Sequence, residues 1–147
     1  MTTKNNRKLT KIIPLAFGLV AIIAGMSVVP SLGQQEATAA INCPSGGGAC
    51  YGTSGNDTIY GSANRDIILA GAGDDTIFGN GGDDNIYGEA GKDTISGGAG
   101  NDNLYHSGSA SGSDGFADSL DGDSGSDTCH WNSSDGDTMA NCTSIPW

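Results

Sequence analysis

The sequence predicts an all-β fold in which short parallel strands stack as the coils of a solenoid. Residues 52–105 consist of six consecutive nine-residue units: GTSGNDTIY, GSANRDIIL, AGAGDDTIF, GNGGDDNIY, GEAGKDTIS and GGAGNDNLY. Every unit has an Asp at its sixth place and an aliphatic residue at its eighth place. A short period held this strictly is typical of a repeat architecture.

Each unit divides into a turn and a short strand. The first six residues are mostly Gly, Asn, Asp and other small residues, which favour turns over helices or core strands. The last three, as in Thr58–Tyr60, alternate outward, inward and outward, so one aliphatic side chain faces the interior. Two units can form one coil, and stacked coils bury the aliphatic column. The alternative is a disordered Gly/Asp linker, but such linkers do not keep Ile at a fixed phase.

The stacked turns bring carboxylates together. The repeated aspartates are Asp57, Asp66, Asp75, Asp84, Asp93 and Asp102. Carboxylates two units apart become neighbours along the stack and repel each other. A hard cation removes this repulsion, and Ca²⁺ accepts both carboxylate and backbone carbonyl oxygens in a flexible shell. The sequence therefore predicts calcium ions as the partner and cofactor of the chain.

This pattern resembles the hemolysin-type (RTX) calcium-binding nonapeptide, G-G-x-G-x-D-x-U-x. In that family the six-residue loops bind calcium between coils on the same side of a right-handed parallel β-roll. The resemblance implies sites between Asp57 and Asp75, Asp75 and Asp93, Asp66 and Asp84, and Asp84 and Asp102. The chain departs from the motif at its second place, which is occupied by Thr53, Ser62, Asn80 and Glu89.

After residue 105 the register breaks. Residues 106–112, HSGSASG, are predicted to form a flexible insertion, and His106 and His130 are interpreted as surface residues. The pattern resumes over residues 113–147 in a new phase, with candidate ligands at Asp118, Asp127 and Asp137. Asp118 and Asp137 lie 19 residues apart instead of 18, and Asp127 has no evident partner two units away, so calcium sites here are less expected.

Residues 1–39 have the three regions of a secretory signal peptide. A basic head, an apolar run over residues 12–29 and a small-residue site at residues 37–39 follow one another. An uncleaved anchor is the alternative, because the apolar run approaches the ~20 residues that span a bilayer. Either way, we expect an extracellular protein, secreted or on the cell surface.

Cleavage after Ala39 would leave a strongly acidic chain. It would keep two basic residues, Arg65 and Lys92, against 16 acidic ones, so its formal charge would be −14. Nucleic acid is therefore excluded as an expected partner, because no basic patch is present to neutralise phosphates. Without bound cations, self-repulsion should oppose compaction.

Four cysteines behind a signal peptide predict two disulfides in an oxidising compartment. Of the three pairings we favour the local ones, Cys43–Cys50 and Cys129–Cys142, since each would close one open end of the solenoid. These ends are an N-terminal cap, residues 40–51, and a C-terminal cap built around Cys142, Ile145 and Trp147. A metal site is the alternative, but the spacings do not match C-x₂-C pairs.

No catalytic motif is apparent in the chain. It lacks H-E-x-x-H, the G-K-[ST] phosphate loop and G-x-S-x-G, so we expect that it is not an enzyme. The predicted function is calcium binding coupled to folding of a secreted β-roll. One alternative is a calcium-stabilised adhesin or matrix module that binds glycan or cell wall through an outward Thr/aromatic face. Another is an acidic, mostly disordered calcium buffer.

Overall fold

The computed structural model describes residues 38, 40–108 and 113–146. The predicted signal peptide, apart from Thr38, and Trp147 of the predicted C-terminal cap lie outside the described residues. Within the described ranges the regular elements are all β-strands. No helix in this part of the chain has the length and apolar character needed to cross a membrane.

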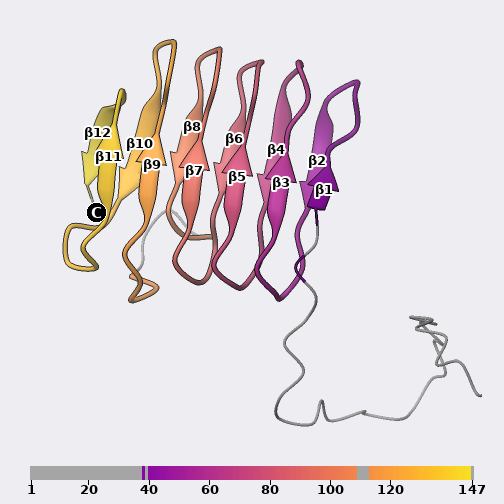
Figure 1. Ribbon diagram of the computed structural model, residues 1–147. Helices are drawn as coiled ribbons and strands as arrows, with labels where there is room; N and C mark the ends of the chain where they lie inside the picture. Colours follow the sequence, from indigo (N-terminus) through magenta and orange to yellow (C-terminus); the bar gives the residue numbers. More distant parts are fainter. Residues whose placement is uncertain (1–37, 39, 109–112, 147) are drawn as a thin grey trace, which may run out of the picture. The chain divides into compact units, whose positions relative to one another are not determined.

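Twelve short strands form two six-stranded parallel sheets (Figure 1). The first sheet contains β1 (Ala40–Asn42), β3 (Thr58–Tyr60), β5 (Thr76–Phe78), β7 (Thr94–Ser96), β9 (Ser119–Asp121) and β11 (Thr138–Ala140). The second contains β2 (Gly48–Tyr51), β4 (Asp66–Leu69), β6 (Asn85–Tyr87), β8 (Asn103–Tyr105), β10 (Thr128–Trp131) and β12 (Thr143–Pro146). Because the chain alternates between the sheets, each odd strand and the next even strand make one coil. The predicted parallel β-solenoid is confirmed.

The interior is a column of aliphatic side chains, one from each of the strands β3 to β9. Ile59 is in register with Ile77 on one sheet, and Ile68 with Ile86 on the other. The column comprises Ile59, Ile68, Ile77, Ile86, Ile95, Leu104 and Leu120, each at most 1% exposed. Burying one such side chain contributes about 1.5–3 kcal/mol relative to leaving it exposed. The structure thus confirms the predicted alternation within each unit.

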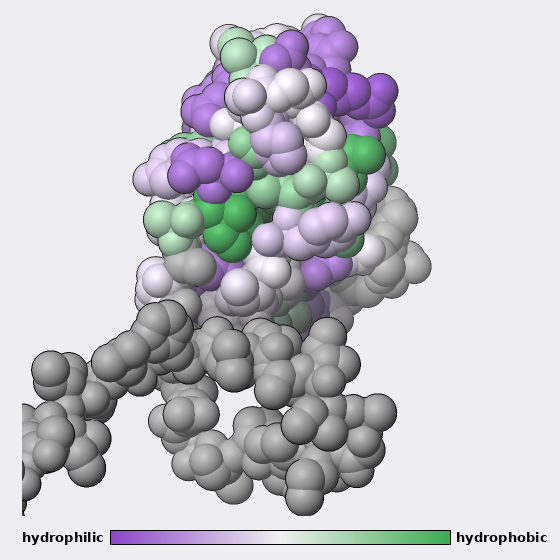
Figure 2. Space-filling model, turned by 90° about the vertical axis from the view of Figure 1, so that its right-hand side faces the viewer, coloured by the Kyte–Doolittle hydropathy of each residue, from purple (hydrophilic) through white to green (hydrophobic). Residues whose placement is uncertain are grey.

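Both predicted disulfides are present. Cys43–Cys50 joins Cα atoms 5.3 Å apart, and Cys129–Cys142 joins Cα atoms 5.8 Å apart. At the N-terminal end the bonded segment is also a complete coil, because β1 and β2 pair with β3 and β4. Figure 2 shows this end of the solenoid, where hydrophobic surface (green) lies in the middle between polar residues (purple).

The C-terminal end leaves apolar side chains partly exposed. Met139 is 37% exposed and Ile145 is 41% exposed. β12 pairs in parallel with β10 and places Ile145 beside His130. His130 lies on the outer side of its strand, where its ring stacks on Tyr105 with centroids 4.2 Å apart.

Both sheets continue across the insertion. Ile95 of β7 is in register with Leu120 of β9, which lies 25 residues later instead of 18. The insertion therefore adds seven residues between neighbouring coils, and the strands that follow it still pair in register with those before it. The surface interpretation of His106 is wrong, because this side chain is only 1% exposed.

Candidate calcium sites

Nine buried aspartates form two rows along the solenoid. One row contains Asp57, Asp75, Asp93, Asp118 and Asp137, and the other contains Asp66, Asp84, Asp102 and Asp127. Each of the nine is at most 6% exposed. The structure thus brings together all the aspartates predicted as ligands, including those that follow the insertion.

The expectation that Asp127 lacks a partner is wrong. Its carboxylate accepts a hydrogen bond from the backbone N–H of Asp102, which precedes it by 25 residues. Asp118 and Asp137 also meet, because the backbone N–H of Asp118 donates to Oδ1 of Asp137 at 3.0 Å. The irregular spacing is therefore absorbed in loops and does not interrupt either row.

Backbone hydrogen bonds hold each row together. The N–H of each aspartate except the last in its row donates to Oδ1 of the aspartate one coil later, for example from Asp57 to Asp75 at 2.7 Å. These hydrogen bonds form one ladder along each row, and the other bonds of the two ladders measure 2.7–3.0 Å. Hydrogen bonds to an ionised acceptor are about twice as strong as neutral ones. One oxygen of each accepting carboxylate is therefore satisfied by the protein, which the sequence argument from repulsion alone did not foresee.

The second oxygen, Oδ2, is the candidate ligand. It is buried and has no hydrogen-bond partner in Asp75, Asp84, Asp93, Asp102, Asp118 and Asp127. A buried acceptor left without a partner costs about 1–3 kcal/mol, and a charged one costs more. A hard dication with oxygen ligands removes this cost. These six carboxylates therefore fit calcium.

The other three aspartates differ because their own loops satisfy Oδ2. The backbone N–H of Thr53 donates to Asp57 Oδ2 at 2.6 Å. Equivalent bonds join Ser62 to Asp66 at 2.6 Å and Asn132 to Asp137 at 2.7 Å. Asp57, Asp66 and Asp137 lie in the first coil and the last coil of the rows. The protein thus supplies a partner for Oδ2 at the start of both rows and at the end of the first row, whereas Asp127, at the end of the second row, keeps an Oδ2 without a partner. Oδ1 of Asp66 is also buried without a hydrogen-bond partner.

Backbone conformation at the second place of the loop goes with this difference in five of the six loops whose Oδ2 has no partner. There that place has a positive φ, for example 71° at Asn80 and 75° at Glu89. Gly71, Gly98 and Asp123 also have positive φ at this place, whereas Asp114 in the loop of Asp118 does not. Thr53 and Ser62 do not have a positive φ either, in keeping with its steric cost for residues with a Cβ, above all β-branched ones. In the regular repeats, the conformation of this residue therefore separates the loops that satisfy Oδ2 from those that do not.

Glycine at the first place leaves room for the carboxylate. A Cβ at Gly88 would lie 2.4 Å from Oδ2 of Asp93, and one at Gly97 would lie 2.6 Å from Oδ2 of Asp102. No side chain fits there without displacing the oxygen that is available to an ion. This explains, in physical terms, why the motif begins with glycine in these units.

Burial raises the pKa of the carboxyl groups in the middle of the rows. The pKa of Asp75 and of Asp84 rises to about 6, that of Asp118 to about 7 and that of Asp93 to about 8. The hydrogen bond from the preceding aspartate lowers each pKa, and neighbouring acidic groups raise it further. Without a counter-charge, the middle of each row therefore resists ionisation.

A family model described as the RTX calcium-binding nonapeptide repeat matches the chain in four copies. The matches cover residues 51–85, 78–108 and 112–130, which is just over half of the chain. No curated protein and no solved structure matches the chain. The matched repeats bind Ca²⁺, in agreement with the open carboxylates described above. The chain therefore belongs to the family of proteins with RTX calcium-binding nonapeptide repeats.

Proposed function

We propose that the protein is a secreted calcium-binding β-roll that folds around calcium ions held between its loops. The observation that carries this proposal is the set of buried Oδ2 atoms without a hydrogen-bond partner in the two aspartate rows. In the calcium-free chain they are desolvated without compensation. Ions that bind the ordered coils and not the unfolded chain stabilise the fold.

The chain prepares the ligands before the ion arrives. The ladder holds each carboxylate through Oδ1, so that Oδ2 is left for the ion. Calcium supplies the positive charge, and Asp75, Asp84, Asp93, Asp102 and Asp127 are the residues that would hold it, whereas Oδ2 of Asp118 lies beside His106. The two disulfides support secretion, because such bonds form in oxidising compartments.

Export suits a calcium-dependent fold. Extracellular calcium modules bind with dissociation constants of about 10⁻⁴–10⁻³ M. An affinity in that range keeps the chain unfolded in a calcium-poor cytoplasm and folded outside the cell. We further propose that the chain is not an enzyme. In support, the described residues form no pocket for a substrate, and the buried carboxylates repeat along the whole stack.

A module that binds glycan or cell wall through an outer face is the second candidate. Thr58, Thr76 and Thr94 are in register on one sheet, and this regular face favours it. However, Tyr60 and Phe78 stack on each other with centroids 5.4 Å apart, so the ring faces that would receive a sugar cover one another. Retention on cells that is lost in a Thr76→Ala/Phe78→Ala variant with intact calcium-dependent folding would favour this candidate.

The experiment that tests the proposed function is circular dichroism of residues 40–147, the expected mature form, titrated with calcium. Magnesium serves as the control ion, and both disulfides are kept intact. We expect a cooperative gain of β-structure with calcium alone. A chain that binds calcium but stays disordered would point to an acidic buffer, and a chain already folded in chelator would limit calcium to an accessory role.

A further inference from the structure

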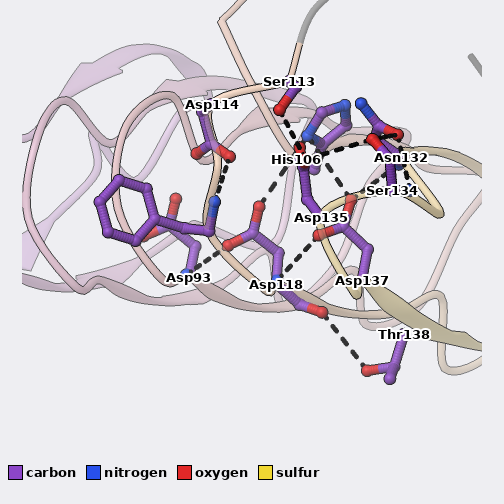
Figure 3. Close-up of polar contacts among 11 residues, drawn as sticks. Asp93, His106, Ser113, Asp114, Asp118, Asn132, Ser134, Asp135, Asp137 and Thr138 are labelled. Carbon is purple, nitrogen blue, oxygen red and sulfur yellow. Dashed lines mark hydrogen bonds and ion pairs between the residues drawn. The ribbon is translucent and has the colours of Figure 1, made fainter.

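A different polar cluster lies where the insertion rejoins the solenoid. His106 is buried, and neither nitrogen of its imidazole ring has a hydrogen-bond partner. Its Nδ1 lies 3.6 Å from Oδ2 of Asp137 and 4.0 Å from Oδ2 of Asp118 (Figure 3). Asp114 is half-buried beside them, and its Oδ2 also lacks a hydrogen-bond partner. His106, Asp114 and Asp118 each offer one possible ligand atom, and these three atoms lie within 4.8 Å of one another.

We propose that His106, Asp114, Asp118 and Asp137 form a binding site for a divalent transition-metal ion, with Zn²⁺ as the representative ion. Calcium takes oxygen ligands, whereas imidazole nitrogen is a preferred ligand of zinc and similar metals. Two ligands bonded at about 2.1 Å to a tetrahedral ion lie about 3.4 Å apart. The separations of 3.6 and 4.0 Å from Nδ1 of His106 are close to this value.

An ion pair with a protonated histidine does not account for the cluster equally well. Neither carboxylate oxygen lies within hydrogen-bonding distance of Nδ1, and Nε2 has no partner at all. Three carboxylates surround one imidazole, so a protonated ring would still leave a net charge of −2. A divalent ion bound to a neutral ring leaves −1, and it gives the buried nitrogen the partner it lacks.

The protein already holds the ligands in place. Asp118 Oδ1 accepts the N–H of Asp93 at 2.7 Å, and Asp114 Oδ1 accepts the N–H of Phe116 at 3.0 Å. Asp137 Oδ2 accepts the N–H of Asn132, and its other lone pairs stay available. Such outer contacts orient metal ligands. In Asp118 and Asp137, Oδ2 is the oxygen that approaches Nδ1 of His106.

The break in the repeat provides the ligands that the repeat itself does not contain. His106 and Asp114 stand at either end of the insertion, whereas Asp118 and Asp137 belong to one of the aspartate rows. The register break therefore turns the last step of that row from an all-oxygen site into a mixed nitrogen and oxygen site. The four cysteines do not compete for the metal, because all of them are in disulfides.

The first test uses the full chain carrying His130→Tyr, with both disulfides formed and calcium at saturation. This change leaves His106 as the only histidine and keeps an aromatic ring beside Tyr105. Zn²⁺ is then added while the imidazole C–H signals are followed by NMR. We expect the signals of His106 to shift and saturate at one ion per chain. Signals that stay unchanged while calcium remains bound would overturn the proposal without affecting the calcium sites.

The second test compares His106→Asn with His130→Asn in the calcium-loaded protein. Zinc affinity is measured by competition with a chelating dye. Loss of an outer contact already weakens metal binding roughly 10–100-fold, so loss of the His106 ligand should cost at least that much. The His130 variant should bind zinc as the parent does. Equal zinc affinity in the two variants would show binding by carboxylates alone and would contradict the role of His106.

Discussion

At the scale of single residues, the second place of a regular repeat loop decides whether Oδ2 of its aspartate has a partner. Thr53 and Ser62 direct a backbone N–H at the carboxylate of their own loop, so Oδ2 of Asp57 and of Asp66 is satisfied by the protein. Asn80 and Glu89 have positive φ, and the corresponding aspartates keep an oxygen without a partner. Sequence comparison with the motif treats all four residues as the same departure, because it does not contain the backbone conformation.

We expect Asp84→Asn to weaken calcium-dependent folding. The amide keeps the shape of the side chain but removes the charge from the middle of one row. Hydrogen bonds to charged groups contribute about 1.5–3 kcal/mol, so the calcium concentration at the folding midpoint should rise roughly tenfold or more. Circular dichroism against calcium concentration measures this midpoint. Asp83→Asn is the matched control, because Asp83 is the neighbouring acid on the exposed side of the loop; equal effects of the two changes would contradict the role of Asp84.

At the scale of the strand, three residues are enough to form a stable strand because the strands of the neighbouring coils supply its hydrogen-bond partners. Each of the strands β3 to β10 has one buried apolar side chain and hydrogen-bonds to the coils before and after it. The sequence predicts this from the alternation of inward and outward residues. It does not predict β1 and β2, because their segments lack the repeated Asp and are recognised only from their pairing with β3 and β4.

The inward and outward places of a strand should respond differently to truncation. Ile86→Ala removes a fully buried side chain and leaves a cavity, which should lower the free energy of unfolding by about 2–5 kcal/mol. Ile67→Ala, at a place that is 42% exposed, should change it by only about 0.5 kcal/mol. Urea unfolding in saturating calcium measures both values. Similar losses in both variants would mean that the core is not a single column.

At the scale of the whole molecule, a thin core is combined with many buried acids. The carboxyl groups in the middle of the rows have pKa values raised by burial, to about 8 in Asp93. Two disulfides restrain the ends. The stability of the stack therefore depends on the solution as much as on the core, through pH, calcium and redox state.

Without metal, the fold should become less stable as pH rises. A raised pKa means that the folded chain holds protons more tightly than the unfolded chain, whose aspartates titrate near 3.8. This contribution to stability is complete below about pH 4 and is lost as pH rises through about 6 to 8. Thermal unfolding of the metal-free protein between pH 4 and 8 tests this dependence. Stability that increases with pH over the same range would contradict it.

Removing the C-terminal disulfide should destabilise the fold even with calcium bound. A Cys129→Ser/Cys142→Ser variant loses a cross-link with a sequence separation of 13 residues, and this should lower the free energy of unfolding by about 2–4 kcal/mol. The corresponding Cys43→Ser/Cys50→Ser variant opens a shorter loop, with a separation of 7 residues, and should lose less. Urea unfolding of both variants gives the comparison. No loss in either would show that the caps do not depend on the cross-links.

The sequence by itself determined the period, the inward aliphatic residues and the aspartate rows as far as Asp102. These follow from a constant offset, because the neighbour of a residue in a regular solenoid always lies 18 positions away. Only the tertiary structure decided that Asp127 follows Asp102, that a loop N–H satisfies Oδ2 in three of the carboxylates and that His106 is buried. The insertion changes the offset to 25 residues, and loop closure depends on φ. Neither follows from the identity of single residues. The offset depends on where the chain re-enters the stack, and the partner of Oδ2 depends on the backbone conformation of the loop.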